Sequence, residues 1–113
     1  MKIINREQFL KEPIGTVFSY FEPNYFTGLY VKNNDPDKWE GDFLLDNIIG
    51  AIKHDNMEEM AQLLQESIDT GKELEMDYNF TDREGIFDQK QLFAVYSPDD
   101  VAGMVNRLQV LLF

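Results

Sequence analysis

The sequence predicts an α+β domain built on a mostly antiparallel sheet. Short segments with strand-like composition follow one another, turn signals separate them, and strands and helices do not alternate regularly. We expect about five short strands, two main helices and a short N-terminal helix, in a single domain over residues 1–113. The first hairpin leaves open whether the sheet stays open or curls into a barrel-like shape.

A short helix is predicted to begin after Asn5. Asn5 suits the N-cap, and Gln8 stands three residues later, where it can complete a capping box. Ile4 and Phe9 occupy the two positions of a hydrophobic staple. Pro13 predicts an end after one or two turns, because the residue before a proline avoids the helical region.

Three strands are predicted next. Residues 16–21 and 25–32 are rich in β-branched and aromatic side chains and flank the turn signal at residues 22–24, so they predict a hairpin. Gly28 in the second strand predicts a bulge or a close backbone approach. Residues 42–49 are apolar without a clear period, which predicts a short third strand.

The clearest helix is predicted over residues 57–70. Asn56 suits its N-cap, and Gly71 suits the left-handed residue at its end. Apolar side chains recur at helical spacing and predict one buried face. That face comprises Met57, Met60, Ala61, Leu64 and Ile68.

Residues 74–80 alternate strictly between apolar and polar side chains, the strongest strand signal in the chain. This pattern predicts that Leu74, Met76, Tyr78 and Phe80 face a core. Residues 81–85 read as a turn and residues 91–96 as a further strand. Ser97 and Pro98 predict the start of the last helix, whose expected buried face is Val101, Met104, Val105 and Leu108.

The net charge of −11 is concentrated in the middle of the chain. Residues 34–56 sum to −4 and residues 57–85 to −7, whereas residues 1–33 sum to +1. Such a surface disfavours nucleic acid or an anionic membrane as a direct partner and favours a basic protein surface. The candidate binding residues are Glu58, Glu59, Glu66, Asp69, Glu73, Glu75 and Asp77. The alternative is that this charge serves solubility alone.

The side chains that most enzymes use are scarce. The chain has no cysteine, and His54 is its single histidine, so thiolate metal sites and the usual zinc sites lack ligands. Residues 35–42 resemble a calcium loop superficially, but Trp39 and Glu40 stand where a ligand and a glycine belong. Asp46 is the best candidate for a buried acid. We expect no enzymatic activity, no metal and no cofactor.

Two segments, NREQFLKEPIGTVFSYFEP and REGIFDQKQLFAVYSPDDV, resemble small acidic proteins of phages and prophages. The resemblance implies a phage-type context and carries no catalytic motif. In that context small acidic proteins often bind and block host machinery, including defence systems that handle nucleic acids.

The expected function is therefore a non-enzymatic interaction protein. Its acidic surface would bind or inhibit a basic nucleic-acid-binding or host-defence protein, as a mimic of nucleic acid. The alternative is a homo-oligomeric structural or accessory protein joined through Val110, Leu111, Leu112 and Phe113. The sequence shows no secretory signal and no apolar run of the ~18 residues that span a bilayer, which predicts a cytoplasmic location without membrane contact.

Overall fold

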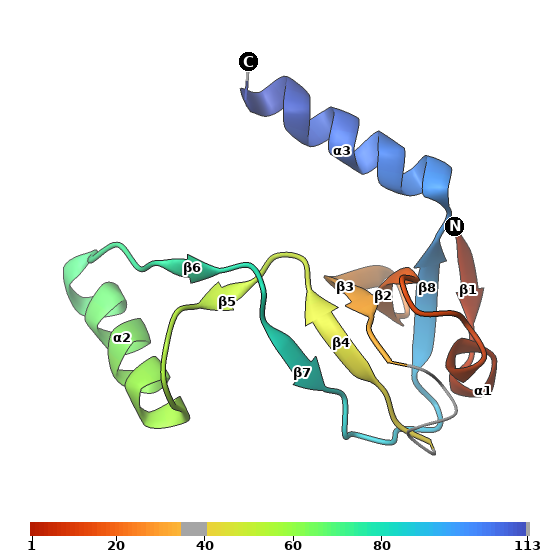
Figure 1. Cartoon of the computed structure of the whole chain (residues 1–113), viewed down its shortest axis with the longest axis horizontal. Coiled ribbons are helices and arrows are strands. Elements are labelled where there is room, and N and C mark those ends of the chain that lie inside the picture. The colour runs from red at the N-terminus through yellow and green to blue at the C-terminus, as the bar shows by residue number, and fades with distance from the viewer. Residues whose placement is uncertain (35–40, 113) are drawn as a thin grey trace.

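The computed structural model describes residues 1–34 and 41–112 (Figure 1). Within these ranges the N-terminal half contains β1 (Lys2–Ile4), α1 (Arg6–Leu10), β2 (Val17–Glu22), β3 (Tyr25–Lys32), β4 (Leu44–Asn47) and β5 (Ala51–Ile52). The C-terminal half contains α2 (Met57–Thr70), β6 (Met76–Asp77), β7 (Thr81–Arg83), β8 (Leu92–Tyr96) and α3 (Pro98–Leu112).

Six strands form one antiparallel sheet in the order β1-β8-β2-β3-β4-β7. β5 and β6 form a separate two-stranded ribbon. The predicted α+β class with a mostly antiparallel sheet is confirmed. Across the described residues the sheet is not closed into a barrel, and β1 and β7 lie at its two ends. The chain has more strands than predicted, because β1, β5 and β7, of three, two and three residues, are too short to leave a periodic pattern in the sequence.

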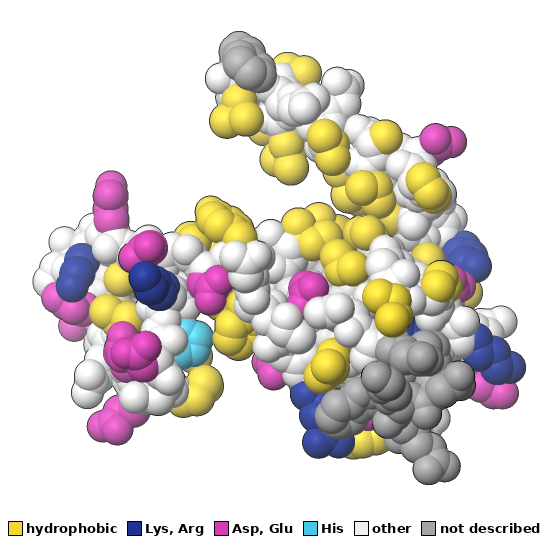
Figure 2. Space-filling view, viewed as in Figure 1, with side chains coloured by type: hydrophobic (Ala, Val, Ile, Leu, Met, Phe, Trp, Pro, Cys, Tyr) yellow, Lys and Arg dark blue, Asp and Glu magenta, His cyan; other side chains and the backbone are white. Residues whose placement is uncertain are grey.

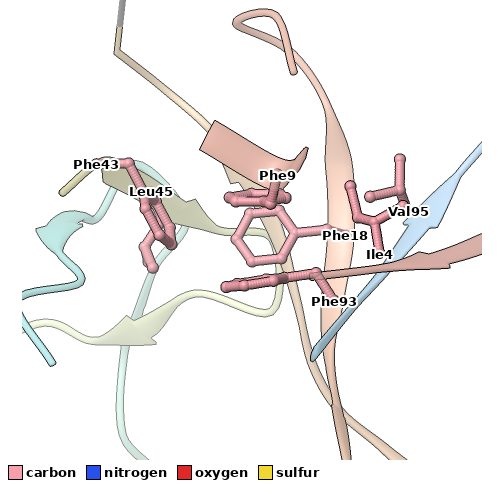
Figure 3. Packing of buried hydrophobic residues seen from close by; sticks show 7 residues of the cluster. All are labelled: Ile4, Phe9, Phe18, Phe43, Leu45, Phe93 and Val95. Carbon is pink, nitrogen blue, oxygen red and sulfur yellow. The ribbon is translucent and has the colours of Figure 1, made fainter. Parts of the chain in front are cut away.

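Aromatic rings from α1 and the sheet form the core (Figure 3). The Phe9 ring from α1 stacks on Phe93 at 4.2 Å between centroids and meets Phe18 and Phe43 edge-on at 4.6 and 5.0 Å. Such pairs are worth about 0.5–1.5 kcal/mol beyond the area they bury. Phe9 is the second residue of the predicted staple, so the local helix signal also anchors α1 on the sheet.

The buried Lys32 side chain of β3 fastens the end of α1. Its Nζ donates to the backbone carbonyls of Phe9, Leu10 and Glu12 at 3.2, 2.9 and 2.8 Å. These carbonyls lie at and just beyond the end of the helix, where intrahelical partners run out. Burial lowers the pKa of the Lys32 ammonium, against the opposing effect of Glu12.

The predicted caps and the predicted hairpin are confirmed. Asn5 and Gln8 form the capping box of α1, and Asn56 Oδ1 accepts the Glu59 N–H at 2.8 Å. Gly71 ends α2 in the left-handed conformation. The β2–β3 register shifts between Phe18 and Tyr20, opposite the segment that contains Gly28.

The predicted buried faces of α2 and α3 are largely wrong, because only Met60, Val101 and Met104 among their members are half-buried and the others are exposed. Both helices extend away from the sheet (Figure 1), and Met57, Ile68 and Leu108 are 68, 76 and 62 % exposed. The Cα radius of gyration is 16.0 Å, against about 13 Å for a compact chain of this length. Helical periodicity identifies an apolar face, but the fold places no sheet against it.

The strand predicted over residues 74–80 is also largely wrong. Within it Met76 and Asp77 alone are in a strand, paired with β5, and Tyr78 is 68 % exposed. The ribbon has no second layer to bury alternate side chains, so the alternation does not mark a core strand. Residues 81–83 form β7 where a turn was predicted. The calcium-loop candidate, apart from Gly41 and Asp42, and Phe113 lie outside the described residues.

Candidate functional site

The acidic residues singled out in the sequence lie together on one projection of the molecule. We call residues 51–77, which comprise β5, α2 and β6, the arm; it extends from the β4–β7 side of the sheet (Figure 1). The arm carries eight carboxylates and two lysines, a net charge of −6. More than half of the net charge of the chain therefore lies on about a quarter of its residues.

Local hydrogen bonds define the segments on either side of α2. The Lys53 N–H donates to the Glu75 carbonyl at 2.7 Å, which extends the β5–β6 pairing towards the helix. At the far end Ser67 Oγ donates to the Lys72 carbonyl at 2.8 Å and the Gly71 N–H to the Ser67 carbonyl at 2.8 Å. These bonds set where the ribbon ends and where the helix stops.

The sides of α2 differ in chemistry. Met60, Leu63 and Ser67 follow each other at helical spacing and are half-buried. A second side is apolar and exposed; we call it the arm stripe, and it comprises Met57, Ala61, Leu64 and Ile68. A third side is the acidic row of Glu58, Glu66 and Asp69, all exposed.

The remaining predicted residues lie on or near the ribbon. Glu73 and Glu75 are exposed, while Glu59 and Asp77 are half-buried. Glu66 pairs with Lys72 at 3.4 Å and Glu75 with Lys53 at 3.7 Å. These pairs are exposed, and pairs of this kind contribute about 0–1 kcal/mol. Acidic side chains gather over the arm in Figure 2, and these weak pairs leave most of its carboxylates accessible to a partner.

The exposed arm stripe is a candidate functional feature that the sequence did not predict. The periodicity of α2 identified its residues, but a buried position was expected for them. An apolar strip beside charged groups is the composition of a protein–protein interface, with an apolar centre and a polar rim. α2 carries more apolar side chains than two short flanking strands can cover. That excess is the sequence signal that could have predicted an exposed apolar side.

A pocket of about 300 Å³ lies where the arm joins the sheet. Tyr20, Tyr30, Asn47 and Ala51 are among its lining residues. Burial raises the pKa of Tyr20, and the nearby Glu84 carboxylate adds to the rise. The phenol therefore stays neutral at physiological pH and cannot serve as a base there.

His54 and Asp46, the other candidates for chemistry, are held in structural contacts. His54 Nδ1 lies 2.6 Å from the Ile52 carbonyl oxygen. Asp46 accepts hydrogen bonds from Asn33 Nδ2 and Thr81 Oγ1 across neighbouring strands. Among the described residues, no group of three or more His, Asp or Glu side chains is placed to hold a metal ion.

Comparisons with known proteins find no matching family model, curated protein or solved structure. In the described part of the chain, no helix has both the length and the apolar character needed to cross a bilayer. The geometry of the arm is therefore the basis for assigning a function.

Proposed function

We propose that the protein is a non-enzymatic interaction module whose arm binds a basic partner protein. The observation that carries this proposal is the exposed arm stripe beside the acidic row on one protruding helix. An amphipathic helix of this kind binds by laying its apolar face into a groove. The partner that fits is a protein with an apolar groove edged by Lys and Arg.

The resemblance to small acidic phage proteins makes the proposal more specific. We infer that the partner is a nucleic-acid-binding or host-defence protein, which the arm inhibits by occupying its basic surface. Rows of carboxylates repel nucleic acid and attract surfaces that bind it. The cysteine-free chain is compatible with action in the reducing cytoplasm.

Charge-reversal variants test the role of the arm. The variant Glu58→Lys/Asp69→Lys alters the acidic row, and Ile68→Ser alters the arm stripe. The matched control Glu7→Lys/Asp99→Lys makes the same change of charge at exposed helical positions outside the arm. Each full-length protein is immobilised, and bound host proteins are identified by mass spectrometry at low and at high salt.

The proposal expects a basic protein that binds wild type and the control but is lost from both arm variants. Its capture should also fall at high salt, because exposed charges are screened. An unchanged set of bound proteins for the arm variants would refute the proposal. Loss with the control variant as well would mean that net charge, and not the arm, governs binding.

A second candidate function is that of a homo-oligomeric accessory protein. The observation that favours it is the exposed apolar end of α3, where Val110, Leu111 and Leu112 are 67, 76 and 79 % exposed. Monomeric proteins rarely expose large contiguous apolar patches. Under this candidate the charge of the arm serves solubility, and reversing it leaves the oligomer intact.

A further inference from the structure

α3 carries an apolar stripe that nothing in the described chain covers along its outer half. Its members recur at helical spacing on one side of the helix: Val101, Met104, Val105, Leu108, Leu111 and Leu112. Val101 and Met104 are half-buried near the sheet, whereas Leu108 is 62 % exposed. Val110 is as exposed as Leu108 but lies on the opposite side of the helix, because the two positions are two residues apart.

The sheet has a second apolar face that complements this stripe. We call it the open face. Directly paired residues point to the same side of a sheet, which assigns to this face Ile3, Val17, Ser19, Phe21, Phe26, Val31, Leu92, Ala94 and Tyr96. Ser19 and Ala94 are buried, and the other members are half-buried or exposed. Tyr96 Oη donates to Ser19 Oγ at 2.7 Å, so the two hydroxyl groups of the open face pair with each other. α1 covers the other face, where Phe9 packs.

A groove joins the stripe to the open face. It measures about 740 Å³ and is lined by Val17 and Tyr96 of the open face, Val101 of α3 and the chain around Ile14. Figure 2 shows hydrophobic side chains along the side of α3 that faces the sheet, and along the margin of the sheet below it. The missing occupant is therefore an apolar element that fits between a helix and a sheet.

We propose that this occupant is α3 of a second copy of the chain. Two α3 helices pair antiparallel about a two-fold axis, and each also packs on the open face of the other copy. The inference rests on the second candidate function and specifies its interface. It differs from the expected contact through Val110, Leu111, Leu112 and Phe113. Val110 lies outside the stripe, and the proposed interface extends along α3 from Val101 to Leu112.

Charge complementarity favours a second copy. Arg107 and Asp100 lie on the same flank of α3, beside the stripe. Arg107 makes no ion pair with any described residue, whereas Asp100 also pairs with the Met1 amino group of its own chain at 2.7 Å. A two-fold axis between antiparallel helices brings identical flanks together. Arg107 of one copy then lies near Asp100 of the other when the helices cross near Met104. The antiparallel helix dipoles also attract.

The length and the low charge of α3 suit a surface for self-association. A helix of fifteen residues is about 22 Å long, and each copy contributes both a helix stripe and a sheet face. α3 has a net charge of −1, whereas the strongly acidic arm extends from the opposite side of the sheet (Figure 1). Self-association therefore keeps the acidic arms away from the interface.

Matched variants of the full chain test the interface. Leu108→Glu places a charge in the stripe, and Val110→Glu places the same charge at an equally exposed position on the other side of α3. We expect sedimentation equilibrium to give a dimer for wild type and for Val110→Glu. Leu108→Glu should weaken association at least tenfold. Circular dichroism checks that both variants keep their helices.

Crosslinking tests the antiparallel geometry. The natural chain has no cysteine, so Met104→Cys introduces a single thiol near the proposed two-fold axis, and Val110→Cys introduces one on the far side. A short bis-maleimide should join two copies of Met104→Cys efficiently and leave Val110→Cys uncoupled.

Two outcomes would overturn the inference. A dimer that survives Leu108→Glu, or that fails to crosslink through position 104, refutes this interface and leaves homo-oligomerisation by another surface in place. A monomeric wild-type chain at every concentration refutes both the interface and the second candidate function. Neither result bears on the arm, which is tested by its own variants.

Discussion

At the scale of single residues, a buried ion pair joins the N-terminal helix to the far side of the sheet. Arg6 Nη1 and Nη2 donate to the two Glu84 carboxylate oxygens at 3.1 and 2.9 Å, and both side chains are 1 % exposed. Arg6 also donates to the Gly41 carbonyl at 2.8 Å. Arg6 and Glu84 are 78 positions apart in sequence, so no local pattern predicts their pairing.

Breaking this pair should destabilise the protein strongly. Arg6→Met leaves the Glu84 carboxylate buried without its cation, which typically lowers the free energy of unfolding by about 3–5 kcal/mol. The double variant Arg6→Met/Glu84→Leu removes both charges and should recover part of that loss. Urea unfolding monitored by circular dichroism measures both. A double variant less stable than Arg6→Met would contradict the argument.

A second buried acid makes stability depend on pH. Burial by itself raises the pKa of Asp42, but the Arg83 guanidinium and the Gly85 and Phe43 N–H groups outweigh it, so the pKa lies below its ordinary value. The carboxylate therefore stabilises the fold above about pH 4, the range of an unfolded Asp. This contribution is lost as pH falls through the lower folded pKa.

The variant Asp42→Asn isolates this effect. We expect its unfolding free energy to lie below that of wild type at pH 7 and the difference to shrink as pH falls below about 4. Urea unfolding between pH 3 and pH 7 measures the difference. A constant difference over this range would show that Asp42 does not carry the acid sensitivity.

At the scale of elements, a glycine in α3 and a glycine in β3 differ in whether their positions have room for a side chain. Gly103 lies inside α3, and a Cβ added there meets no described atom within 4 Å. Gly28 in β3 has φ of +72°, and an added Cβ would clash with the Tyr30 ring. The first position tolerates a side chain and the second does not.

Alanine substitutions should therefore act in opposite directions. Gly103→Ala should stabilise α3 by up to about 1 kcal/mol, because alanine is the better helix former. Gly28→Ala should destabilise the hairpin by at least about 1 kcal/mol, through its left-handed backbone and the ring contact. Helical ellipticity and thermal unfolding of the two variants measure these opposite effects. A loss of helix in Gly103→Ala would contradict the first expectation.

At the scale of the whole molecule, the core and the extensions differ in stability. The aromatic cluster holds α1 on the sheet, whereas α2 has no fully buried residue. Elements with little buried apolar surface open locally at low free energy. The arm is thus expected to be the more easily opened part of the molecule, which suits a segment that adapts to a partner.

Hydrogen exchange should separate these parts. Backbone amides of α2 are expected to exchange through local opening, at a free energy well below that of the β2 and β8 amides, which should report global unfolding. Mass spectrometry of peptides spanning residues 57–70 and 92–96 makes the comparison. Equal protection of the two segments would mean that the arm unfolds together with the core.

Local structure was largely determined by the sequence. The caps at Asn5, Asn56 and Ser97 satisfy backbone groups within a few residues, and the apolar period of each long helix is set by its own side chains. The concentration of acidic residues in the middle of the chain was also evident from the sequence, since it depends on composition alone.

Which apolar faces are buried was decided by the tertiary structure alone. Phe9 lies in the core, whereas Leu64 and Leu108, identified by helical periodicity, are exposed, because burial depends on whether a distant segment folds over a face. For the same reason β1 and β5 were missed and the alternation at residues 74–80 was misread: two or three residues become a strand only when a partner strand supplies the hydrogen bonds. The acidic row and the arm stripe became one candidate site when the fold held α2 out from the sheet.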